Sequence, residues 1–150
     1  MISIVVCYSL GMKYSFLDDH HEYTENDGLI FKNQFHVVFC PKYKRPVLKE
    51  GINQRLMVLF YAEAERMHVR ILSLDILPDH VHMFIEFDPR MTLHKVVKQF
   101  KSVSSHILRK EYPQLVSKLP SLWTRSYIST TDAILDEAVI KDYLNSQRGK

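Results

Sequence analysis

Cysteine is scarce in this chain, whose 150 residues include only Cys7 and Cys40. The two are far apart, and no Cys-x-x-Cys pair is present. Disulfide-stapled scaffolds and thiolate zinc sites need several suitably spaced cysteines. The composition therefore disfavours both classes, and the cytoplasm is the expected compartment.

Long apolar runs are missing as well. Met1–Leu10 is apolar, but it is far too short to span a bilayer. It has no basic beginning and no small-residue cleavage site, so we do not interpret it as a signal peptide. Two interpretations stay open: an added edge strand, or a start codon assigned too early, because Met12 follows at once.

Repeats and low-complexity segments are absent too. Hydrophobic residues (46%) and charged residues (25%) occur at the levels of ordinary globular proteins. A chain of this length can bury a sizeable core as one domain, which we expect over residues 34–150, with residues 1–33 as an N-terminal extension. The net charge of +3 permits a nucleic-acid partner without demanding one.

The spacing of apolar residues predicts the elements of this domain. Strands are predicted at Gln34–Cys40, Val69–Leu77, His80–Phe87 and Trp123–Thr131. Helices are predicted at Ile52–His68, from a Thr92 cap through Lys110, and at Ala133–Gln147 with Thr131 or Asp132 as the cap. Loops are predicted at Asp18–Gly28 and Tyr112–Pro120.

The order of these elements is β-α-β-β-α-β followed by a helix. The corner at Pro78-Asp79 is so short that the strands on either side must pair antiparallel. Two crossover helices on one face of such a sheet describe the α+β, ferredoxin-like split βαβ fold. The last helix is additional to that fold.

The most informative stretch is Leu77–Glu86, with the sequence Leu-Pro-Asp-His-Val-His-Met-Phe-Ile-Glu. Side chains alternate along a strand, so His80 and His82 are expected side by side on one face. Two imidazoles at this spacing can bind one metal ion. The pattern alone is weak, and two hydrogen-bonded histidines at a strand edge are an equal alternative.

The predicted last helix places Tyr143 and Gln147 one turn apart. A tyrosine in such a helix usually packs in a core or an interface, but its oxygen can also attack an activated electrophile. A metal ion activates a phosphodiester by neutralising a non-bridging oxygen. Two histidines with an amide or carboxylate oxygen suit zinc and other transition metals somewhat better than Mg²⁺ or Mn²⁺.

Basic residues gather in the loop at 42–46 and on the polar face of the helix that follows Thr92. Such residues are usually just solvated, and contact with nucleic-acid phosphates is the alternative.

Taken together, these segments resemble the single-tyrosine HUH transposases of the small insertion sequences. The matching pieces lie in family order over Gln34–Gln147: Phe35-His-Val-Val-Phe with Lys42-Tyr-Lys-Arg-Pro, the stretch Leu77–Glu86, Lys101-Ser-Val-Ser-Ser, Leu122-Trp-Thr-Arg-Ser-Tyr, and Glu137-Ala-Val-Ile-Lys-Asp-Tyr-Leu-Asn-Ser-Gln. Matches in several places are far more specific than the histidine pair alone.

The resemblance implies a set of roles. His80 and His82 become the metal-binding pair, Gln147 the third ligand and Tyr143 the nucleophile. The expected cofactor is a divalent metal, Mg²⁺ or Mn²⁺. The expected reaction is cleavage and rejoining of single-stranded DNA through a 5′-phosphotyrosine, which mobilises an insertion sequence.

The resemblance also implies partners and no membrane. It predicts a homodimer, in which the tyrosine helix can dock on the partner's HUH face to give a composite active site. It predicts single-stranded DNA hairpins at the element ends as substrate. The candidate DNA contacts are Lys42, Lys44, Arg45, Lys98, Lys101, Ser105 and Arg109.

Three features depart from the family pattern. Ser129–Glu137 stands where members usually have small residues and glycine as a hinge, the chain stops three residues after Gln147 whereas many members continue, and the first 30 residues have no counterpart. Alternative functions are a repeat-associated, domesticated transposase and a non-catalytic module that binds single-stranded nucleic acid. A structural core in which the histidine pair is merely packed is the third alternative.

Overall fold

A computed structural model describes residues 16–132 and 136–150 of the chain. It divides into two compact units, one ending at Lys32 and the other covering Asn33–Lys150, which are described separately. Met1–Leu10 lies outside the described residues. No helix in the described part of the chain is long and apolar enough to cross a membrane.

The first unit contains a short helix and a hairpin where only a loop was expected. Helix α1 (Phe16–Asp19) precedes strands β1 (Thr24–Asn26) and β2 (Leu29–Phe31), which pair antiparallel. Asp27 and Gly28 connect the strands, and both have positive φ. Asp-Gly is a favoured dipeptide for such a two-residue hairpin turn, so the loop prediction for Asp18–Gly28 was wrong.

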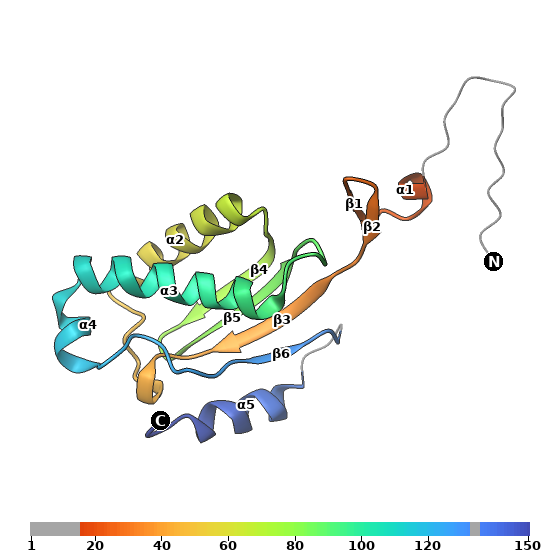
Figure 1. The fold of residues 1–150 in the computed structure, drawn as a ribbon. Coiled ribbons are helices and arrows are strands. Elements are labelled where there is room, and N and C mark those ends of the chain that lie inside the picture. Colours follow the sequence, from red (N-terminus) through yellow and green to blue (C-terminus); the bar gives the residue numbers. More distant parts are fainter. Residues whose placement is uncertain (1–15, 133–135) are drawn as a thin grey trace, which may run out of the picture. The chain divides into compact units, whose positions relative to one another are not determined.

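The second unit is built on a four-stranded antiparallel sheet in the order β4-β5-β3-β6. Helices α2 and α3 lie on one side of it, and α5 lies on the other (Figure 1). This arrangement confirms the ferredoxin-like expectation. The strands are β3 (Gln34–Phe39), β4 (Arg70–Leu77), β5 (His80–Glu86) and β6 (Ile128–Thr130), and the helices are α2 (Ile52–Met67), α3 (Leu93–Glu111), α4 (Pro113–Lys118) and α5 (Glu137–Ser146).

The main core lies between the sheet and the pair α2 and α3. Alternate residues of β5, Val81, Met83 and Ile85, are fully buried in it. Phe60 from α2 and Phe100 from α3 meet edge to face with ring centres 5.5 Å apart. Apolar burial of this extent is the main stabilising contribution to a domain of this size.

A bulge in β4 adjusts which of its residues face the core. Ile71 pairs with Ile85, but the next pair is Ser73 with Phe84, so Leu72 is an extra residue. After the bulge, Leu74 pairs with Met83 on the core side. One inserted residue therefore keeps the apolar side chains of β4 directed at the core.

Three further boundaries differ from the expectations. Helix α4 replaces the predicted link, with Pro113 at its first position, where a missing N–H costs nothing. The predicted fourth strand shrinks to β6, because Trp123 makes only a single bridge, with Pro41, and donates from Nε1 to Ser104 Oγ at 3.0 Å. The 42–44 segment is a 3₁₀ turn, η1.

Helix α5 begins later than expected. Its N-cap is Asp136, whose carboxylate accepts from the backbone N–H groups of Ala138 and Val139 at 3.0 and 3.4 Å. The predicted caps Thr131 and Asp132 do not fill this role. The predicted helix start at Ala133 lies outside the described residues. The sequence pattern did not indicate Asp136 as the cap, because this residue lies within the segment predicted to be helical.

Candidate active site

The histidine pair lies on the α5 side of the sheet. Along β5, His80, His82 and Phe84 are half-buried, while the residues between them are fully buried in the core. The strand alternation predicted from the sequence is therefore confirmed. Strand β5 lies between β4 and β3, so both imidazoles are carried by a rigid, interior strand.

His80 is oriented by the residue before it. Asp79 Oδ1 lies 2.8 Å from His80 Nδ1, and Lys44 Nζ lies 3.6 Å from Asp79 Oδ2. Partial burial raises the pKa of Asp79, but the hydrogen bond to His80 and the charges of His80 and Lys44 outweigh it and hold that pKa below its usual value. An ionised Asp79 accepts the Nδ1 proton of His80, which leaves Nε2 as the nitrogen that can bind a metal.

His82 contacts a third histidine. Its Nε2 lies 3.2 Å from His36 Nδ1 on β3, and the His36 ring stacks on Phe84 with centres 4.1 Å apart. Burial and the neighbouring His36 lower the pKa of His82, which favours the neutral imidazole. A neutral imidazole is the form that binds metals. Sequence reasoning missed His36, because the register of β3 against β5 cannot be read from periodicity.

Tyr143 and Gln147 are brought together by one hydroxyl. Ser126 Oγ, in the segment before β6, lies 2.9 Å from Tyr143 Oη and donates to Gln147 Oε1 at 2.8 Å. Burial raises the pKa of Tyr143. The tyrosine is therefore a neutral phenol at neutral pH. Sequence reasoning gave Ser126 no role, and its only signal was its place in Leu122-Trp-Thr-Arg-Ser-Tyr.

The direction of each hydrogen bond in this cluster follows from counting protons. Ser146 Oγ donates its only proton to the Tyr143 carbonyl at 2.6 Å, so it accepts from Gln147 Nε2 at 3.0 Å. This places Gln147 Oε1 against Ser126, which donates to it. Since Ser126 also has one proton, Tyr143 O–H must donate to Ser126. The four side chains and one carbonyl form a closed circuit.

Lys101 supports this circuit from α3. Its Nζ donates to the backbone carbonyls of Thr124 and Ser126 at 2.6 and 3.2 Å and lies 5.6 Å from the centre of the Phe39 ring. Burial lowers the pKa of Lys101 to about 8. Lys101, which was expected to contact DNA, is thus turned inward, where it holds the backbone of Ser126 in place.

The other predicted DNA contacts divide into three groups. Arg109 also binds backbone, donating to the carbonyls of Leu115, Leu119 and Pro120. Arg45 and Lys98 are exposed, and Ser105 is half-buried. Lys98 and Ser105, with Arg125, line a groove of about 610 Å³ beside α3. Lys42 lies 5.3 Å from the centre of the Tyr43 ring, and Lys44 is the partner of Asp79.

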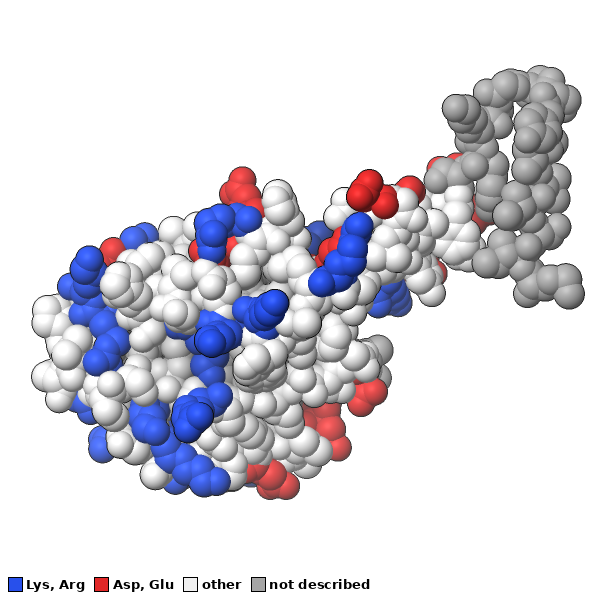
Figure 2. Space-filling model, in the orientation of Figure 1, with Lys and Arg blue, Asp and Glu red and all other residues white. Residues whose placement is uncertain are grey.

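Basic side chains are spread over the part of the second unit where α3, α4 and η1 lie, and acidic ones gather near α5 (Figure 2).

The donor atoms fit a divalent cation with three protein ligands at most. Among the described residues, no three His, Cys, Asp or Glu side chains form a metal-binding group. His80 and His82 therefore need the Gln147 amide oxygen, or oxygens from water or substrate, to complete a site. In this arrangement His82 Nε2 contacts His36 and Gln147 Oε1 contacts Ser126, so both contacts must be exchanged on metal binding. No hydrogen bond joins either histidine to Tyr143 or Gln147 within the described chain.

Likeness to solved structures agrees with this fold. A candidate transposase from Deinococcus radiodurans R1 matches with a TM-score of 0.77 and 24% identity over 85% of this chain and 99% of that one. The REP-associated tyrosine transposase, solved with a REP hairpin, matches with a TM-score of 0.51 and 14% identity over 81% of this chain and 68% of that one. Both likenesses concern the fold.

Sequence comparison gives the family. Residues 29–147 match the family described as "Transposase IS200 like", so the chain belongs to it and is a transposase. It is similar to the ISDra2 transposase TnpA of Deinococcus radiodurans, with 28% identity over 86% of this chain and 94% of that protein. It is also similar to the transposase for insertion sequence element IS200 of Salmonella typhimurium, with 29% identity over 76% of each.

Proposed function

We propose that this transposase cleaves and rejoins single-stranded DNA through a 5′-phosphotyrosine on Tyr143, and so mobilises an insertion sequence. The observation that carries the proposal is the joining of Tyr143 and Gln147 by Ser126, on the sheet face that presents His80 and His82. Any buried tyrosine hydroxyl needs a hydrogen-bond partner, so the support comes from which partner it has: Ser126 is shared with Gln147, the proposed metal ligand.

In the proposed step, Tyr143 Oη forms a bond to the scissile phosphorus and the bond from phosphorus to the 3′-oxygen breaks. The phenolic proton is lost and the departing 3′-oxygen gains one, so no water or nucleotide is consumed. A 3′-hydroxyl from a second strand end reverses the step and restores Tyr143. The phosphodiester energy is kept in the protein–DNA bond throughout.

His80, His82 and Gln147 are the residues that would bind the divalent metal, for which we propose Mg²⁺ or Mn²⁺. When bound, the metal would neutralise a non-bridging phosphate oxygen. Asp79 would keep the His80 ring in the tautomer with Nε2 open. The chain's own contribution is thus to orient two imidazoles and to deliver the phenol.

The proposed substrate is a single-stranded DNA hairpin at an element end. One fold neighbour was solved with a REP hairpin, which supports a hairpin as the ligand class. Lys98 and Ser105, lining the groove beside α3, and the exposed Arg45 are the proposed phosphate contacts. We further propose a homodimer in the cytoplasm, in which α5 can serve the partner's histidine pair.

A denaturing-gel assay tests the proposal. The protein is mixed with labelled single-stranded hairpins drawn from DNA flanking its gene, with Mg²⁺, with Mn²⁺ or with a chelator. A covalent adduct is expected with either metal. It should disappear with chelator, in Tyr143→Phe and in His82→Ala, with at least a thousandfold loss for the nucleophile, since no other group replaces it.

Tyr61→Phe is the matched control, because Tyr61 is exposed on α2, on the other side of the sheet. It should form the adduct at the wild-type rate. Binding of every hairpin without any adduct would contradict the proposal and favour the non-catalytic binding module. An adduct that persists in Tyr143→Phe would assign the nucleophile to another residue.

A further inference from the structure

A cavity of about 490 Å³ lies between the loop that leads into α2 and helix α4. We propose that this cavity binds a backbone phosphate of the single-stranded DNA that leads away from the active site. The proposal rests on the proposed function and adds a second anchoring point for the same substrate. No residue of the cavity belongs to the histidine–tyrosine site.

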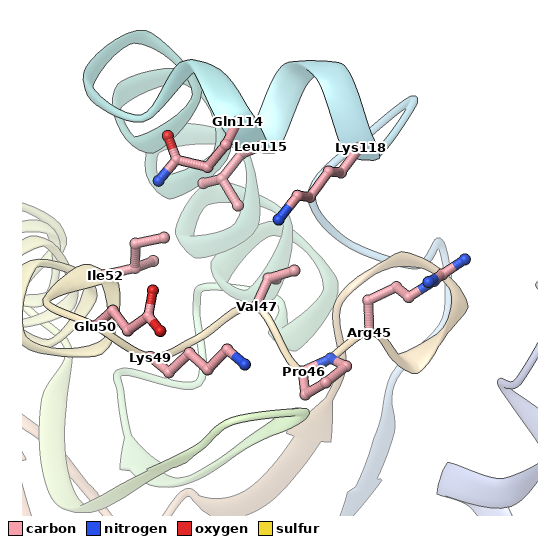
Figure 3. A pocket seen from close by; sticks show the side chains of 9 residues that line it. All are labelled: Arg45, Pro46, Val47, Lys49, Glu50, Ile52, Gln114, Leu115 and Lys118. Atoms are coloured by element: carbon pink, nitrogen blue, oxygen red, sulfur yellow. The ribbon is translucent and has the colours of Figure 1, made fainter.

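Cations outnumber anions among the residues that line the cavity. Arg45 and Lys49 come from the loop and Lys118 from α4, whereas Glu50 is the one acidic residue among those that line it. Figure 3 shows Lys118 and Gln114 on α4 facing the loop segment that carries Lys49 and Glu50. In the described chain none of the three cations forms an ion pair, in contrast to Arg55 with Glu111 nearby at 2.8 Å. An anion would thus meet unneutralised positive charge.

The backbone adds to this preference for an anion. Helix α2 begins at the cavity, since its first residue, Ile52, lines the wall. Its N-cap is Gly51, and no described side chain caps this end of the helix, where Ile52 N–H donates to the Lys49 carbonyl at 3.2 Å. Glu50 and Gly51 both have positive φ, a tight bend that turns the chain into the helix. The positive end of a helix of this length favours a phosphate in combination with Lys49 and Lys118, whereas the Arg45 side chain points away from them (Figure 3).

The lining indicates which part of a nucleotide is recognised. None of the nine lining residues is aromatic, so the cavity has no platform on which a base could stack. Its volume is large enough for a sugar and its phosphate. The recognised group is therefore the charged backbone, without preference for sequence.

The cavity is fixed relative to the histidine strand. Leu48 N donates to Pro78 O at 3.0 Å, directly before Asp79 and His80. Lys44, at the other end of the same loop, pairs with Asp79. Loop and histidines thus share one corner at the end of β5. A single-stranded DNA segment bound at His80 can reach the cavity by passing around this end of the sheet.

Binding of labelled oligonucleotides, followed by fluorescence anisotropy in the absence of metal, tests the inference without requiring catalysis. The probes are a flanking-DNA hairpin alone, the same hairpin with a single-stranded extension on its 5′ or its 3′ side, and oligothymidylate of equal length. Lys49→Ala combined with Lys118→Ala should weaken binding of one extended hairpin about tenfold. The slope of log affinity against log salt should fall by about 0.7 for each lost phosphate contact.

Lys32→Ala combined with Lys95→Ala is the matched control, because it removes the same charge from exposed positions outside the cavity. Glu50→Gln should have the opposite effect and strengthen binding of the extended probe severalfold, whereas Glu65→Gln, on an exposed part of α2, should not. In a further series, each phosphate of the extension is replaced in turn by an uncharged methylphosphonate. At one position only, this replacement should abolish the difference in affinity between the wild type and the Lys49→Ala, Lys118→Ala variant.

If Lys49→Ala with Lys118→Ala weakened binding of the hairpin alone as much as binding of the extended probes, the inference would be overturned. The same holds if the control pair Lys32→Ala with Lys95→Ala lost as much affinity for the extended probe as the cavity pair. Failure of the proposed function is seen separately: a wild-type protein that never forms the Tyr143 adduct refutes the chemistry, while a wild-type adduct with unchanged binding in the cavity variants refutes only the cavity.

Discussion

The two faces of the sheet are built in different ways. On the α2 and α3 side, large apolar side chains interlock: Phe39 meets Trp123 edge to face with centres 4.9 Å apart, and Phe60 meets Phe100. On the α5 side the buried apolar cluster among the described residues is small and consists of Val38, Cys40 and Leu144. The remaining contacts of α5 include the polar circuit through Ser126.

The difference separates stability from chemistry. Interlocked aromatic packing cannot be exchanged for solvent without a large loss of free energy. A hydrogen bond contributes only about 1 kcal/mol net, and a metal or a phosphate can replace it. The α5 face is therefore the face on which contacts can be broken and remade during a reaction.

Removing a large side chain from each face should give the largest contrast. Phe100→Ala should lower the free energy of unfolding by about 3–5 kcal/mol, because it leaves a cavity in the main core. Leu144→Ala should lower it by only about 1 kcal/mol, since α5 can detach while the sheet stays folded. Urea unfolding followed by tryptophan fluorescence measures both. Equal losses would mean that α5 belongs to the same cooperative unit as the core.

The pH dependence of stability should sharpen the comparison next, because Lys101 connects the two faces. Its pKa is about 8 in the folded chain against its usual 10.5. Below pH 8 the folded chain carries a buried charge, and the unfolded chain binds more protons between pH 8 and 10.5. Relative to Lys101→Met, the wild type should therefore gain roughly 2 kcal/mol of unfolding free energy as pH rises through that window.

Lys98→Met is the control for that measurement, because Lys98 is exposed one turn earlier on the same helix. The difference in unfolding free energy between Lys98→Met and the wild type should not change between pH 8 and 10.5. A flat difference for Lys101→Met as well would show that the ammonium is not buried.

The smallest effect is expected from the circuit itself. Ser126→Ala removes one donor and one acceptor at the Tyr143 and Gln147 side chains, so amide hydrogen exchange in α5 should accelerate about fivefold, for a loss of about 1 kcal/mol. Ser126→Thr keeps the hydroxyl and should restore slow exchange. Ser129→Ala, an exposed position on β6, should leave exchange unchanged. Unchanged exchange in Ser126→Ala would show that the circuit does not hold α5.

Periodicity was enough to predict the elements that the core requires. The strand alternation around His82 and the apolar faces of α2 and α3 follow from local spacing, and so does the order of elements that defines the fold. It could also place Tyr143 on the last helix, with Gln147 at its C-terminal end, where the structure makes Gln147 the C-cap. Each of these conclusions depends on residues a few positions apart.

Contacts between distant segments could not be predicted in this way. Lys101 and Arg109 stand on the polar side of α3, yet both turn to backbone carbonyls of the segments that follow the helix. Ser126 gains its position from residues 17 and 21 places later in the chain. Whether a polar side chain meets solvent, DNA or a carbonyl depends on what packs opposite it, and no single-sequence pattern contains that information.

The bulge in β4 determines which of its residues face the core and which face the histidine side of the sheet. With Leu72 inserted, Asp75 pairs with His82 on the side that carries the chemistry, while Leu74 and Ile76 pair with Met83 and Val81 in the core. Deleting Leu72 would remove the bulge and leave Ile71 and Leu74 two positions apart, the spacing at which both still face the core in an unbroken ladder. Deleting Asp75, which lies beyond the bulge, would instead move Ile76 to the opposite face of the sheet. Lineages of this protein should therefore tolerate a single-residue deletion at Leu72 far better than one at Asp75.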